Sequence, residues 1–129
     1  MNNCIFCKIV NKEIPSKTIY EDDKVLIIMD IEPLSDGHLL LIPKNHYDDL
    51  SSTETDVINH MFKVYKDITP KLIKLLDCDG ITILQNEGLC QEVKHTHIHI
   101  IPTYEYNRAI VLPKDNKVSD IESVFNKLT

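Results

Sequence analysis

The 129-residue sequence has no long hydrophobic run. Its longest purely apolar stretches, such as residues 39–42, fall far short of the roughly 20 residues that cross a bilayer, so we expect no membrane span. The sequence also has no low-complexity stretch and only three glycines and six prolines, which excludes collagen-like, disordered and linker-dominated chains. With 43% apolar and 26% charged residues, the composition predicts one globular domain over residues 1–129.

Basic clusters are also missing. The chain has 14 Lys and Arg against 20 Asp and Glu, a formal net charge of −6. We therefore do not expect duplex nucleic acid as a partner. The same net charge repels a phosphate ester at long range, so an anionic substrate needs a locally neutral or cationic pocket. The six histidines are the residues that can supply one.

The first residues read Met-Asn-Asn-Cys-Ile-Phe-Cys-Lys. They show no basic start followed by an apolar stretch of about 7–15 residues, the pattern of a secretory signal, so we expect a cytoplasmic protein. In that compartment four cysteines are expected to be thiols or metal ligands rather than a disulfide framework.

Short apolar or β-branched runs bounded by turn residues predict five strands, the first two forming a hairpin. These strands are expected over residues 18–21, 25–29, 38–43, 80–85 and 96–101. A short helix is expected near the end of the chain, running through Lys127. Ser119 is its expected cap, and Glu122 at the third helical position completes a capping box.

Apolar residues at three- and four-residue steps predict one long amphipathic helix over residues 52–76. Ser52 or Thr53 is its expected cap, and Pro70 is expected to kink or divide it. One side of this helix carries more apolar surface than a single sheet face needs to cover. Part of it is therefore expected to meet a second copy of the chain; the residues on this side are Met61, Val64, Ile68 and Leu72.

Three histidines alternate along the last predicted strand, at positions 95, 97 and 99. Because side chains alternate between the two faces of a strand, the three imidazoles are expected on one face and Thr96 and Ile98 on the other. Such a cluster suits two chemistries. It can hold a metal ion, or it can catalyse with imidazole as nucleophile and proton donor.

Cys4 and Cys7 have the spacing with which two thiolates hold one zinc ion, and His46 with His95 would complete a Cys2His2 set. A redox pair and buried inert thiols are the alternatives for the two cysteines. His60, on the predicted long helix, is interpreted as a solvent-exposed side chain. Cys78 and Cys90 are interpreted as packing residues or as residues without a role.

The run from His95 to Ile101 resembles the signature of the histidine-triad (HIT) family, His-φ-His-φ-His-φ-φ with φ apolar, and departs from it only at Thr96. The resemblance covers residues 4–102 and is closest to the Hint-like branch of nucleotide-binding hydrolases, whose bacterial members often carry paired cysteines and bind zinc. Further segments follow the family's order and spacing at 5–9, 13–15, 20–22, 29–31, 37–38, 41–46 and 86–88.

The resemblance implies an α+β HIT fold, with an antiparallel sheet of about five strands, one long helix across a face and the short C-terminal helix. It also implies a homodimer with two sites. The zinc ion of this branch is structural, and its implied ligands are Cys4, Cys7, His46 and His95.

The implied nucleophile is His97, which attacks the α-phosphorus and forms a covalent nucleotidyl-imidazole that water then hydrolyses. His99 and His38 match the histidines that contact the phosphate and help proton transfer to the leaving group, and Asp30 matches the carboxylate that binds the ribose hydroxyls. The residues that match the apolar slot for the base are Ile5, Phe6, Ile9, Ile28 and Ile31.

The implied contacts to the rest of the nucleotide come from Asn86, Gln91 and Glu92. The loop over residues 89–93 departs from the family pattern, and Glu92 stands where a hydroxyl contacts the phosphate. A carboxylate there would repel the phosphate unless it is turned away, protonated or paired with Lys94.

The function implied by the resemblance is hydrolysis or transfer of a nucleotidyl group. The bond cleaved is that between the α-phosphorus and the leaving group of nucleoside phosphoramidates, or of related adenylylated or dinucleotide purine substrates. Two other functions stay open: a metal-dependent hydrolase that uses the histidines as catalytic ligands, and a nucleotide-binding regulatory module with little turnover.

Overall fold

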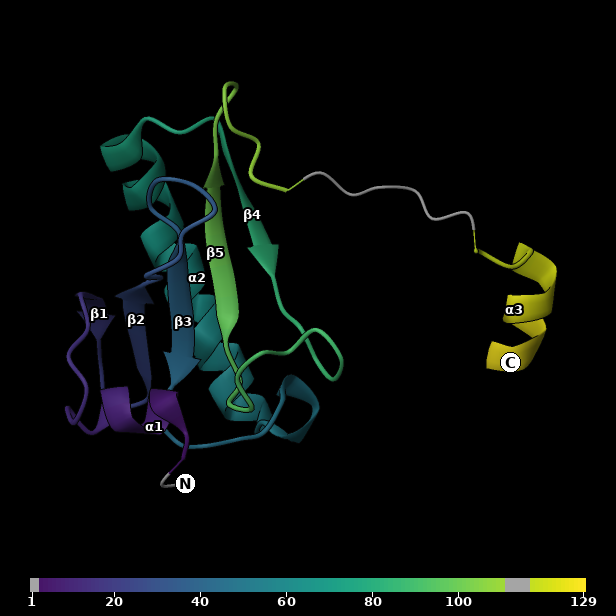
Figure 1. The fold of residues 1–129 in the computed structure, drawn as a ribbon, viewed down its shortest axis with the longest axis horizontal. Coiled ribbons are helices and arrows are strands. Elements are labelled where there is room, and N and C mark those ends of the chain that lie inside the picture. The colour runs from purple at the N-terminus through teal and green to yellow at the C-terminus, as the bar shows by residue number, and fades with distance from the viewer. Residues whose placement is uncertain (1–2, 111–116) are drawn as a thin grey trace.

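A computed structural model of the protein describes residues 3–110 and 117–129. Figure 1 shows one sheet with helices on both sides and a separate helix at the C-terminal end. In chain order the elements are α1 (Ile5–Val10), β1 (Thr18–Glu21), β2 (Val25–Met29), β3 (Leu39–Pro43), the 3₁₀ helix η1 (Leu50–Ser52), α2 (Thr55–Leu76), β4 (Gly80–Leu84), β5 (Ile98–Thr103) and α3 (Ile121–Leu128).

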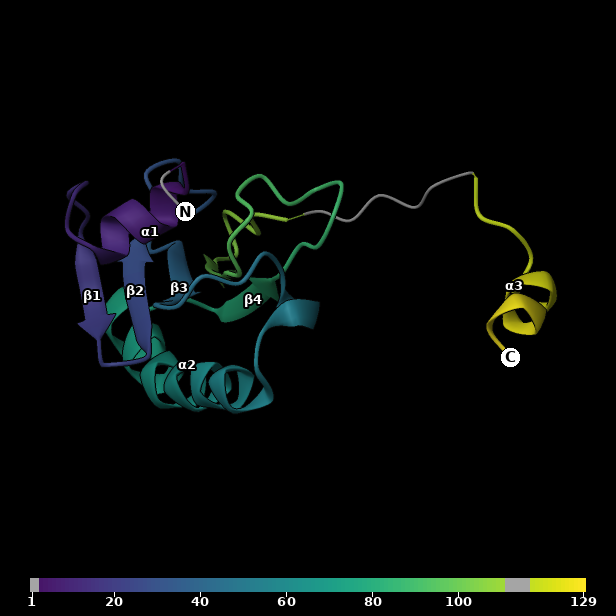
Figure 2. The same ribbon diagram turned by 90° about the horizontal axis from the view of Figure 1, so that it is seen from below.

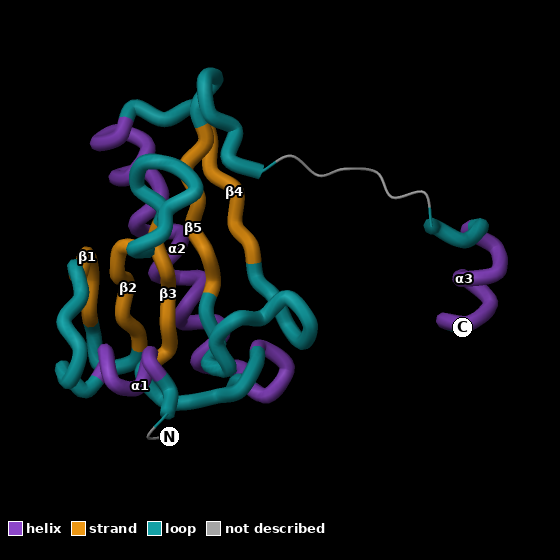
Figure 3. Tube along the Cα trace, in the orientation of Figure 1, coloured by secondary structure: helices purple, strands orange, loops and turns teal. Residues whose placement is uncertain are grey.

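All five strands pair antiparallel in the order β1-β2-β3-β5-β4, as Figure 3 shows. This confirms the predicted α+β class and the five-stranded antiparallel sheet. The hairpin of β1 and β2 has the predicted bounds. The last strand begins at Ile98 instead of Thr96, so two of the three triad histidines precede it.

The sheet has a helix on each face, α1 on one and α2 on the other, as seen from below in Figure 2. Strand residues alternate between two cores, because successive side chains point to opposite faces. The core under α2 contains Val25, Ile27, Leu39, Leu41, Ile98 and Ile100, together with Val57, Met61, Val64 and Leu72 of the helix. The core between α1 and the sheet contains Phe6 and Ile9 of the helix, together with Leu26, Ile28, Leu40 and Ile42 of the strands.

The long helix starts three residues later than predicted. Asp49 accepts a hydrogen bond from the Ser52 N–H and closes a separate 3₁₀ turn, so Ser52 belongs to η1 and Glu54 is the N-cap of α2. The helix continues through Pro70 and is not divided there. Proline removes one intrahelical hydrogen bond, but packing of the apolar side on the sheet supplies most of a helix's stability in a protein.

The side of α2 that was expected to meet a second copy instead faces the sheet. Met61, Val64 and Leu72 are 0%, 4% and 8% exposed, and Ile68 packs partly buried against the same core. The sheet thus covers these side chains, and the expectation of surplus apolar surface among them is wrong. A homodimer stays a prediction.

Neither terminal helix follows the sequence prediction in full. α1 was not predicted, and the Sγ of Cys4 accepts the Cys7 N–H at its first turn. α3 exists but begins one residue later than expected, with Asp120 rather than Ser119 as its N-cap. Within the described residues, no helix is both long and apolar enough to cross a membrane. The single domain over residues 1–129 stays a prediction.

His60 does not stand free in solvent as predicted. Its Nε2 lies 2.7 Å from Oδ2 of Asp22, which also accepts the Tyr20 hydroxyl. Oδ1 of Asp22 accepts the backbone N–H groups of Lys24 and Val25. Burial acts to raise the pKa of Asp22, but these hydrogen bonds outweigh it and lower the pKa well below its usual value.

A lowered folded-state pKa makes the Asp22 carboxylate stabilising above its unfolded pKa of about 3.9. This stabilisation is lost as the pH falls through the folded-state value. We expect Asp22→Asn to reduce the free energy of unfolding near pH 7 by about 2 kcal/mol and to flatten the loss of stability below about pH 4. Urea unfolding at several pH values measures both effects. The matched control is Asp23→Asn at the exposed neighbouring position, and an equal effect there would contradict the assignment.

Candidate functional site

The sheet presents two of the triad histidines on the face under α1. His99 pairs with Leu40 across the β3–β5 ladder, and Ile98 pairs with Leu41, so the two β5 side chains point to opposite faces. Just before β5, Thr96 N–H donates to the Tyr47 carbonyl at 2.9 Å, which holds the triad segment beside residues 46–49. The His97 and His99 rings lie 5.1 Å apart between centroids, so the alternation expected for the triad extends upstream of the strand.

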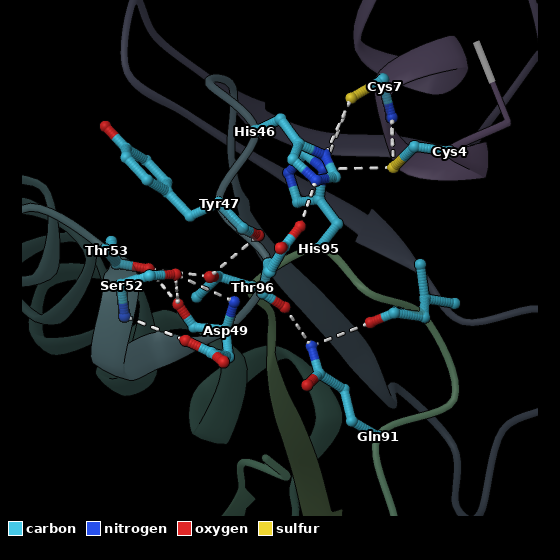
Figure 4. A network of polar contacts seen from close by, with 12 residues as sticks. Cys4, Cys7, His46, Tyr47, Asp49, Ser52, Thr53, Gln91, His95 and Thr96 are labelled. Atoms are coloured by element: carbon cyan, nitrogen blue, oxygen red, sulfur yellow. Dashed lines mark hydrogen bonds and ion pairs between the residues drawn. The ribbon is translucent and has the colours of Figure 1, made fainter. Parts of the chain in front are cut away.

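Cys4, Cys7, His46 and His95 form one cluster, shown in Figure 4. The Nδ1 atom of His95 lies 3.3 Å from Sγ of Cys4 and 3.6 Å from Sγ of Cys7, and His46 Nδ1 lies 3.3 Å from Sγ of Cys7. A tetrahedral zinc ion with Zn–S near 2.3 Å and Zn–N near 2.0–2.1 Å separates sulfur and nitrogen ligands by about 3.5 Å. The four residues thus fit zinc in both donor type and spacing.

In both cluster histidines the hydrogen bond made by Nε2 fixes the tautomer and leaves Nδ1 without a proton. Nε2 of His95 donates to the Pro43 carbonyl at 2.8 Å, and Nε2 of His46 donates to Asp48 Oδ1 at 2.9 Å. Each Nδ1 is then left with a lone pair toward the thiols. Burial lowers the pKa of His95 to about 4, so its imidazole is neutral at pH 7, as a metal ligand must be.

Burial, followed by the neighbouring Cys4, raises the pKa of the Cys7 thiol to about 11. A thiol of this kind stays protonated at pH 7. Metal binding must displace its proton, so occupancy of the cluster is expected to depend on pH.

His97 has a defined tautomer. Its Nδ1 lies 2.7 Å from the backbone carbonyl of His95, and because a carbonyl only accepts, Nδ1 carries the proton. Nε2 of a neutral His97 therefore keeps its lone pair. The ring is 6% exposed and meets the Phe6 ring edge-on at 5.0 Å between centroids, so its orientation is fixed by packing as well.

A chain of hydrogen bonds connects His38 and His99. The Leu34 N–H donates to His38 Nδ1 at 3.0 Å, so a neutral His38 carries its proton on Nε2. That Nε2 lies 2.9 Å from His99 Nδ1 and 3.4 Å from Asp30 Oδ2. His99 consequently accepts at Nδ1 and carries its own proton on Nε2.

Burial and the adjacent His97 and His38 lower the pKa of His99 to about 4, against the opposing effect of Asp30. Burial also lowers the pKa of His38, again opposed by Asp30. Both rings are therefore neutral at pH 7, as the hydrogen-bond chain requires.

Gly37 makes the turn that delivers His38. Its φ of 90° lies in a region that side chains with a Cβ rarely adopt, and a Cβ there would overlap the Leu76 side chain at the end of α2. The turn thus places His38 directly before Leu39, the first residue of β3.

The predicted apolar slot is only partly enclosed. Three of its members are buried in one cluster, and the other two, Ile5 and Ile31, are 44% and 93% exposed. The buried members are Phe6, Ile9 and Ile28. As a binding site for a planar base, this set of residues stays a prediction.

The three predicted contacts in the loop after β4 lie in different environments. Asn86 is partly buried just beyond β4. Gln91 is 7% exposed and donates to the carbonyls of Asp48 and Val93, at 2.6 and 3.0 Å. Glu92 is exposed and turned toward a hollow beside the Cys/His cluster, which it lines with Cys4, His46 and Lys94. As nucleotide contacts, all three stay predictions.

The HIT domain family profile matches residues 11–106 of this chain. The chain belongs to the HIT family. A HIT family protein from Bacillus anthracis superposes with a TM-score of 0.86 at 33% sequence identity, over 98% of this chain and 93% of that one. This confirms the predicted HIT fold.

Two further relatives bear on chemistry. Adenylylsulfatase HINT3 of Arabidopsis thaliana is 43% identical over 106 residues, which are 81% of this chain and 54% of that protein. A zinc-bound histidine triad family protein from Mycobacterium smegmatis has a TM-score of 0.79 at 34% identity, over 90% of this chain and 85% of that one. The HIT domain described here thus resembles both a nucleotide hydrolase and a zinc-binding protein.

The sequence did not indicate several contacts that hold the site of this HIT domain. Asp48 stands two residues after His46, a spacing that suggests the pair in retrospect. The Glu87 carboxylate accepts the N–H and hydroxyl of Ser51 at 3.0 and 2.9 Å, which ties the loop after β4 to η1. Nothing local in the sequence predicts this contact, because the two residues lie 36 positions apart.

The departure from the HIT signature at Thr96 has a structural partner. Thr96 is 0% exposed, and its hydroxyl lies 2.7 Å from that of Thr53, which is 6% exposed. Thr53 donates its single hydroxyl proton to the Asp49 carbonyl at 2.8 Å, so Thr96 is the donor between the two. The Tyr47 carbonyl, at 3.3 Å, is the longer alternative acceptor for Thr96.

This proton count predicts unequal effects of two isosteric substitutions. Thr96→Val leaves the Thr53 bond to Asp49 in place, and we expect less than about 1 kcal/mol loss in the free energy of unfolding. Thr53→Val removes that bond and leaves the buried Thr96 hydroxyl with its longer acceptor, at a cost of about 1–3 kcal/mol. Denaturant unfolding of both single variants and the double variant measures the difference. Equal losses for the two single variants would refute the assigned direction.

Proposed function

We propose that this protein hydrolyses the bond between the α-phosphorus of a purine nucleotide and its leaving group, through a covalent nucleotidyl-His97 intermediate. The substrate class proposed is the nucleoside phosphoramidates, with adenylylated and dinucleotide compounds as related substrates. The comparisons above support a less specific function, that of a nucleotide-binding protein of the HIT family related to a hydrolase.

The observation that carries the proposal is the His97 tautomer. With Nδ1–H donated to the His95 carbonyl, the lone pair of Nε2 is available for attack on phosphorus. In the first step the Nε2–P bond forms and the bond from phosphorus to the leaving group breaks. In the second step water attacks the same phosphorus, and His97 is released together with a nucleoside monophosphate.

His99 is the proposed proton donor to the leaving group. Its Nε2–H is the free donor at the end of the chain from Leu34 through His38. Since His99 and His38 are both neutral at pH 7 and each holds a single ring proton, the proton that the leaving group keeps is drawn from a water molecule through His99. The His38 Nε2–H 2.9 Å away holds the His99 ring in place. The oxygen of that water is added to phosphorus in the second step, so the two steps together consume one water and leave both histidines with the protons they began with.

Asp30 and the slot under α1 are the proposed binding elements for ribose and base. Asp30 is 17% exposed at the end of β2, beside both proton-transfer histidines. The carboxylate can therefore accept from ribose hydroxyls while its other oxygen faces the imidazoles. Gln91 and Glu92 are not required for these contacts.

Zinc is proposed as a structural ion. When bound by Cys4, Cys7, His46 and His95 it supplies a cross-link between the N-terminal segment and the triad segment, and it leaves no position for substrate. We also propose a homodimer, as the family resemblance implies. The cytoplasmic location expected from the sequence stays a prediction.

A metal-dependent hydrolase would use the second His/Asp cluster, Asp30, His38 and His99, whose ligand atoms lie within 4.8 Å of one another. The Leu34 N–H weighs against this use. It occupies Nδ1 of His38, so Nε2 carries a proton where a metal would need a lone pair. Nucleophilic catalysis needs no such rearrangement, and we favour it for this reason.

The test is a turnover screen combined with stereochemistry at phosphorus. Adenosine and guanosine phosphoramidates, dinucleoside polyphosphates, adenylyl sulfate and acyl-adenylates are compared by release of the nucleoside monophosphate. The best substrate is then prepared with a chiral thiophosphoryl group and hydrolysed in isotopically labelled water. Two successive displacements give net retention of configuration, whereas direct attack by water gives inversion.

Retention with a P–N or phosphoanhydride substrate supports the proposal. Inversion, with turnover that a chelator abolishes, would replace it with the metal-dependent hydrolase. Tight nucleotide binding without product would favour the regulatory module.

A further inference from the structure

The turn before β3, over residues 34–37, is held against the C-terminal end of β5 (Figure 1). Ser35 is 5% exposed, and its hydroxyl donates to the Pro102 carbonyl at 2.5 Å. At the next residue, the Asp36 carbonyl accepts the hydroxyl proton of Tyr104 at 2.8 Å, and Tyr104 is 6% exposed. Because both donors are buried, water competes little with either hydrogen bond, and the two bonds fix the turn relative to β5.

A third hydrogen bond holds Leu34, the first residue of the turn. Nδ2 of Asn107 donates to the Leu34 carbonyl at 3.3 Å. Oδ1 of the same amide accepts the Ala109 N–H at 2.9 Å, so the Asn107 nitrogen is the end that faces the turn. Asn107 is itself fixed to Tyr104, because the two residues exchange both backbone hydrogen bonds, at 2.8 and 3.0 Å. Three consecutive residues of the turn are therefore each bonded to the segment 102–107.

Strand pairing does not provide these contacts. The β3–β5 ladder begins with the pair Leu39–Ile100, so the turn lies beyond the end of that ladder. On its other edge, β5 stays paired with β4 through Thr103. The end of β5 is thus part of the sheet, and the three side-chain hydrogen bonds attach the turn to it.

The turn acts on the candidate site through Leu34. The Leu34 N–H donates to Nδ1 of His38, which leaves the His38 proton on Nε2, 2.9 Å from Nδ1 of His99. His99 lies on β5, three residues before Pro102, whose carbonyl accepts the Ser35 hydroxyl. The path of bonds from His99 along β5, through the turn to His38 and back to His99 is therefore closed.

A competing acceptor makes the position of the turn matter. Oδ2 of Asp30 lies 3.4 Å from Nε2 of His38, and a carboxylate is a stronger hydrogen-bond acceptor than a neutral ring nitrogen. If the turn moves, the His38 ring is free to rotate toward Asp30, and His99 loses the donor that holds its ring. A fixed turn keeps the shorter bond to His99.

We propose that Ser35, Tyr104 and Asn107 are positioning residues for the proton-transfer histidines. They fix the turn, which keeps the N–H of its first residue on His38, and His38 then holds the His99 ring so that its Nε2–H is presented to the leaving group. This role rests on the proposed function, since it serves that proton transfer. The alternative is that the three side chains only stabilise the fold, in which case the two rings stay in place when they are removed.

Two conservative variants loosen the turn while keeping most of the packing. Tyr104→Phe removes the hydroxyl and keeps the aromatic ring, Ser35→Ala removes the other buried hydroxyl, and a double variant combines them. The matched controls are Tyr20→Phe on β1 and Ser123→Ala on α3, which each lose a hydrogen-bonded hydroxyl outside the turn. Thermal unfolding establishes the temperature range in which every variant is folded.

The first readout is the hydrogen bond between His38 and His99 in the protein without substrate. NMR of protein with ¹⁵N-labelled histidine rings identifies the protonated nitrogen of each ring, and a scalar coupling between the two nitrogens reports the bond itself. We expect the coupling in the unchanged protein and in both controls. It is expected to weaken in each single variant and to disappear in the double variant. An intact coupling in the folded double variant would overturn the proposal.

The second readout is turnover of the best substrate from the screen above. We expect kcat to fall about 3- to 10-fold in Tyr104→Phe and about 30-fold or more in the double variant. KM is expected to change by less than about 2-fold, because neither side chain is among the proposed nucleotide contacts. A fall in kcat that leaves the coupling between the rings intact would have another cause and would also overturn the proposal.

The two readouts distinguish a failure of this proposal from a failure of the proposed function. Loss of the coupling with unchanged kcat would support the hold of the turn on the two rings and contradict the proposed proton transfer through His99. If no nucleotide is hydrolysed, the proposed function fails. The coupling measured without substrate then still decides whether Ser35 and Tyr104 position His38.

Discussion

Replacing His97 with alanine is expected to reduce turnover by about 10⁴-fold or more, because the covalent route loses its nucleophile. Nucleotide affinity should change little, since the slot under α1 and the carboxylate of Asp30 are untouched. The His97 side chain is 6% exposed and packs against Phe6, so the cavity left by its removal will lower the melting temperature. The melting temperature and the turnover of the variant must therefore both be measured. Pre-steady-state kinetics and nucleotide titration of the same preparation separate the effects.

Two other histidines serve as comparisons for that variant. His99→Ala should reduce turnover less, because water can replace a proton donor more readily than it replaces a nucleophile. His60→Ala removes a histidine of α2 that is paired with Asp22 outside the site, and it should keep the original turnover. A nucleotidyl adduct mapped by mass spectrometry to the peptide with His97 would support the assignment. High activity in His97→Ala that a chelator removes would refute it.

The positions of His97 and His99 were predictable because strand periodicity is a local property. Side chains at every second residue share a face, so the sequence alone placed the two rings together, and the apolar Ile98 and Ile100 identified the opposite face. The start of β5 was predicted two residues too early. Thr96 is hydrogen-bonded to the Tyr47 carbonyl and Thr53 instead of a neighbouring strand, and the residue pattern does not distinguish the two cases.

The tautomers were not predictable, although the chemistry depends on them. They are set by the Leu34 N–H, the His95 carbonyl and the Pro43 carbonyl, which are backbone groups without a sequence signal. α1 was missed because it is six residues long and its first turn is capped by a thiol, an atom that helix signals do not include. The expectation that the apolar side of α2 meets a second copy was wrong because the sheet covers more of that helix than the residue pattern alone indicated.

Replacing Cys4 with serine is expected to lower the melting temperature by roughly 10 °C or more in protein prepared with zinc. At free zinc 1,000 times above the dissociation constant, binding to the folded state alone contributes about 4 kcal/mol of stability. Serine is a poor zinc ligand at neutral pH, so the variant loses most of that contribution. Elemental analysis should find about one zinc per chain in the original protein and much less in Cys4→Ser. Cys90→Ser, at an exposed cysteine outside the cluster, is the matched control.

The same variant tests whether zinc is structural. His95 belongs to the cluster, and its backbone carbonyl also accepts the Nδ1–H of His97 at 2.7 Å, so loss of zinc is expected to disturb the nucleophile indirectly. The Pro43 carbonyl still holds the His95 ring from its other side at 2.8 Å. At a temperature where Cys4→Ser is folded, we therefore expect a loss of turnover far smaller than that of His97→Ala. A loss as large as that of His97→Ala in a folded, nucleotide-binding variant would mean that zinc takes part in the reaction itself.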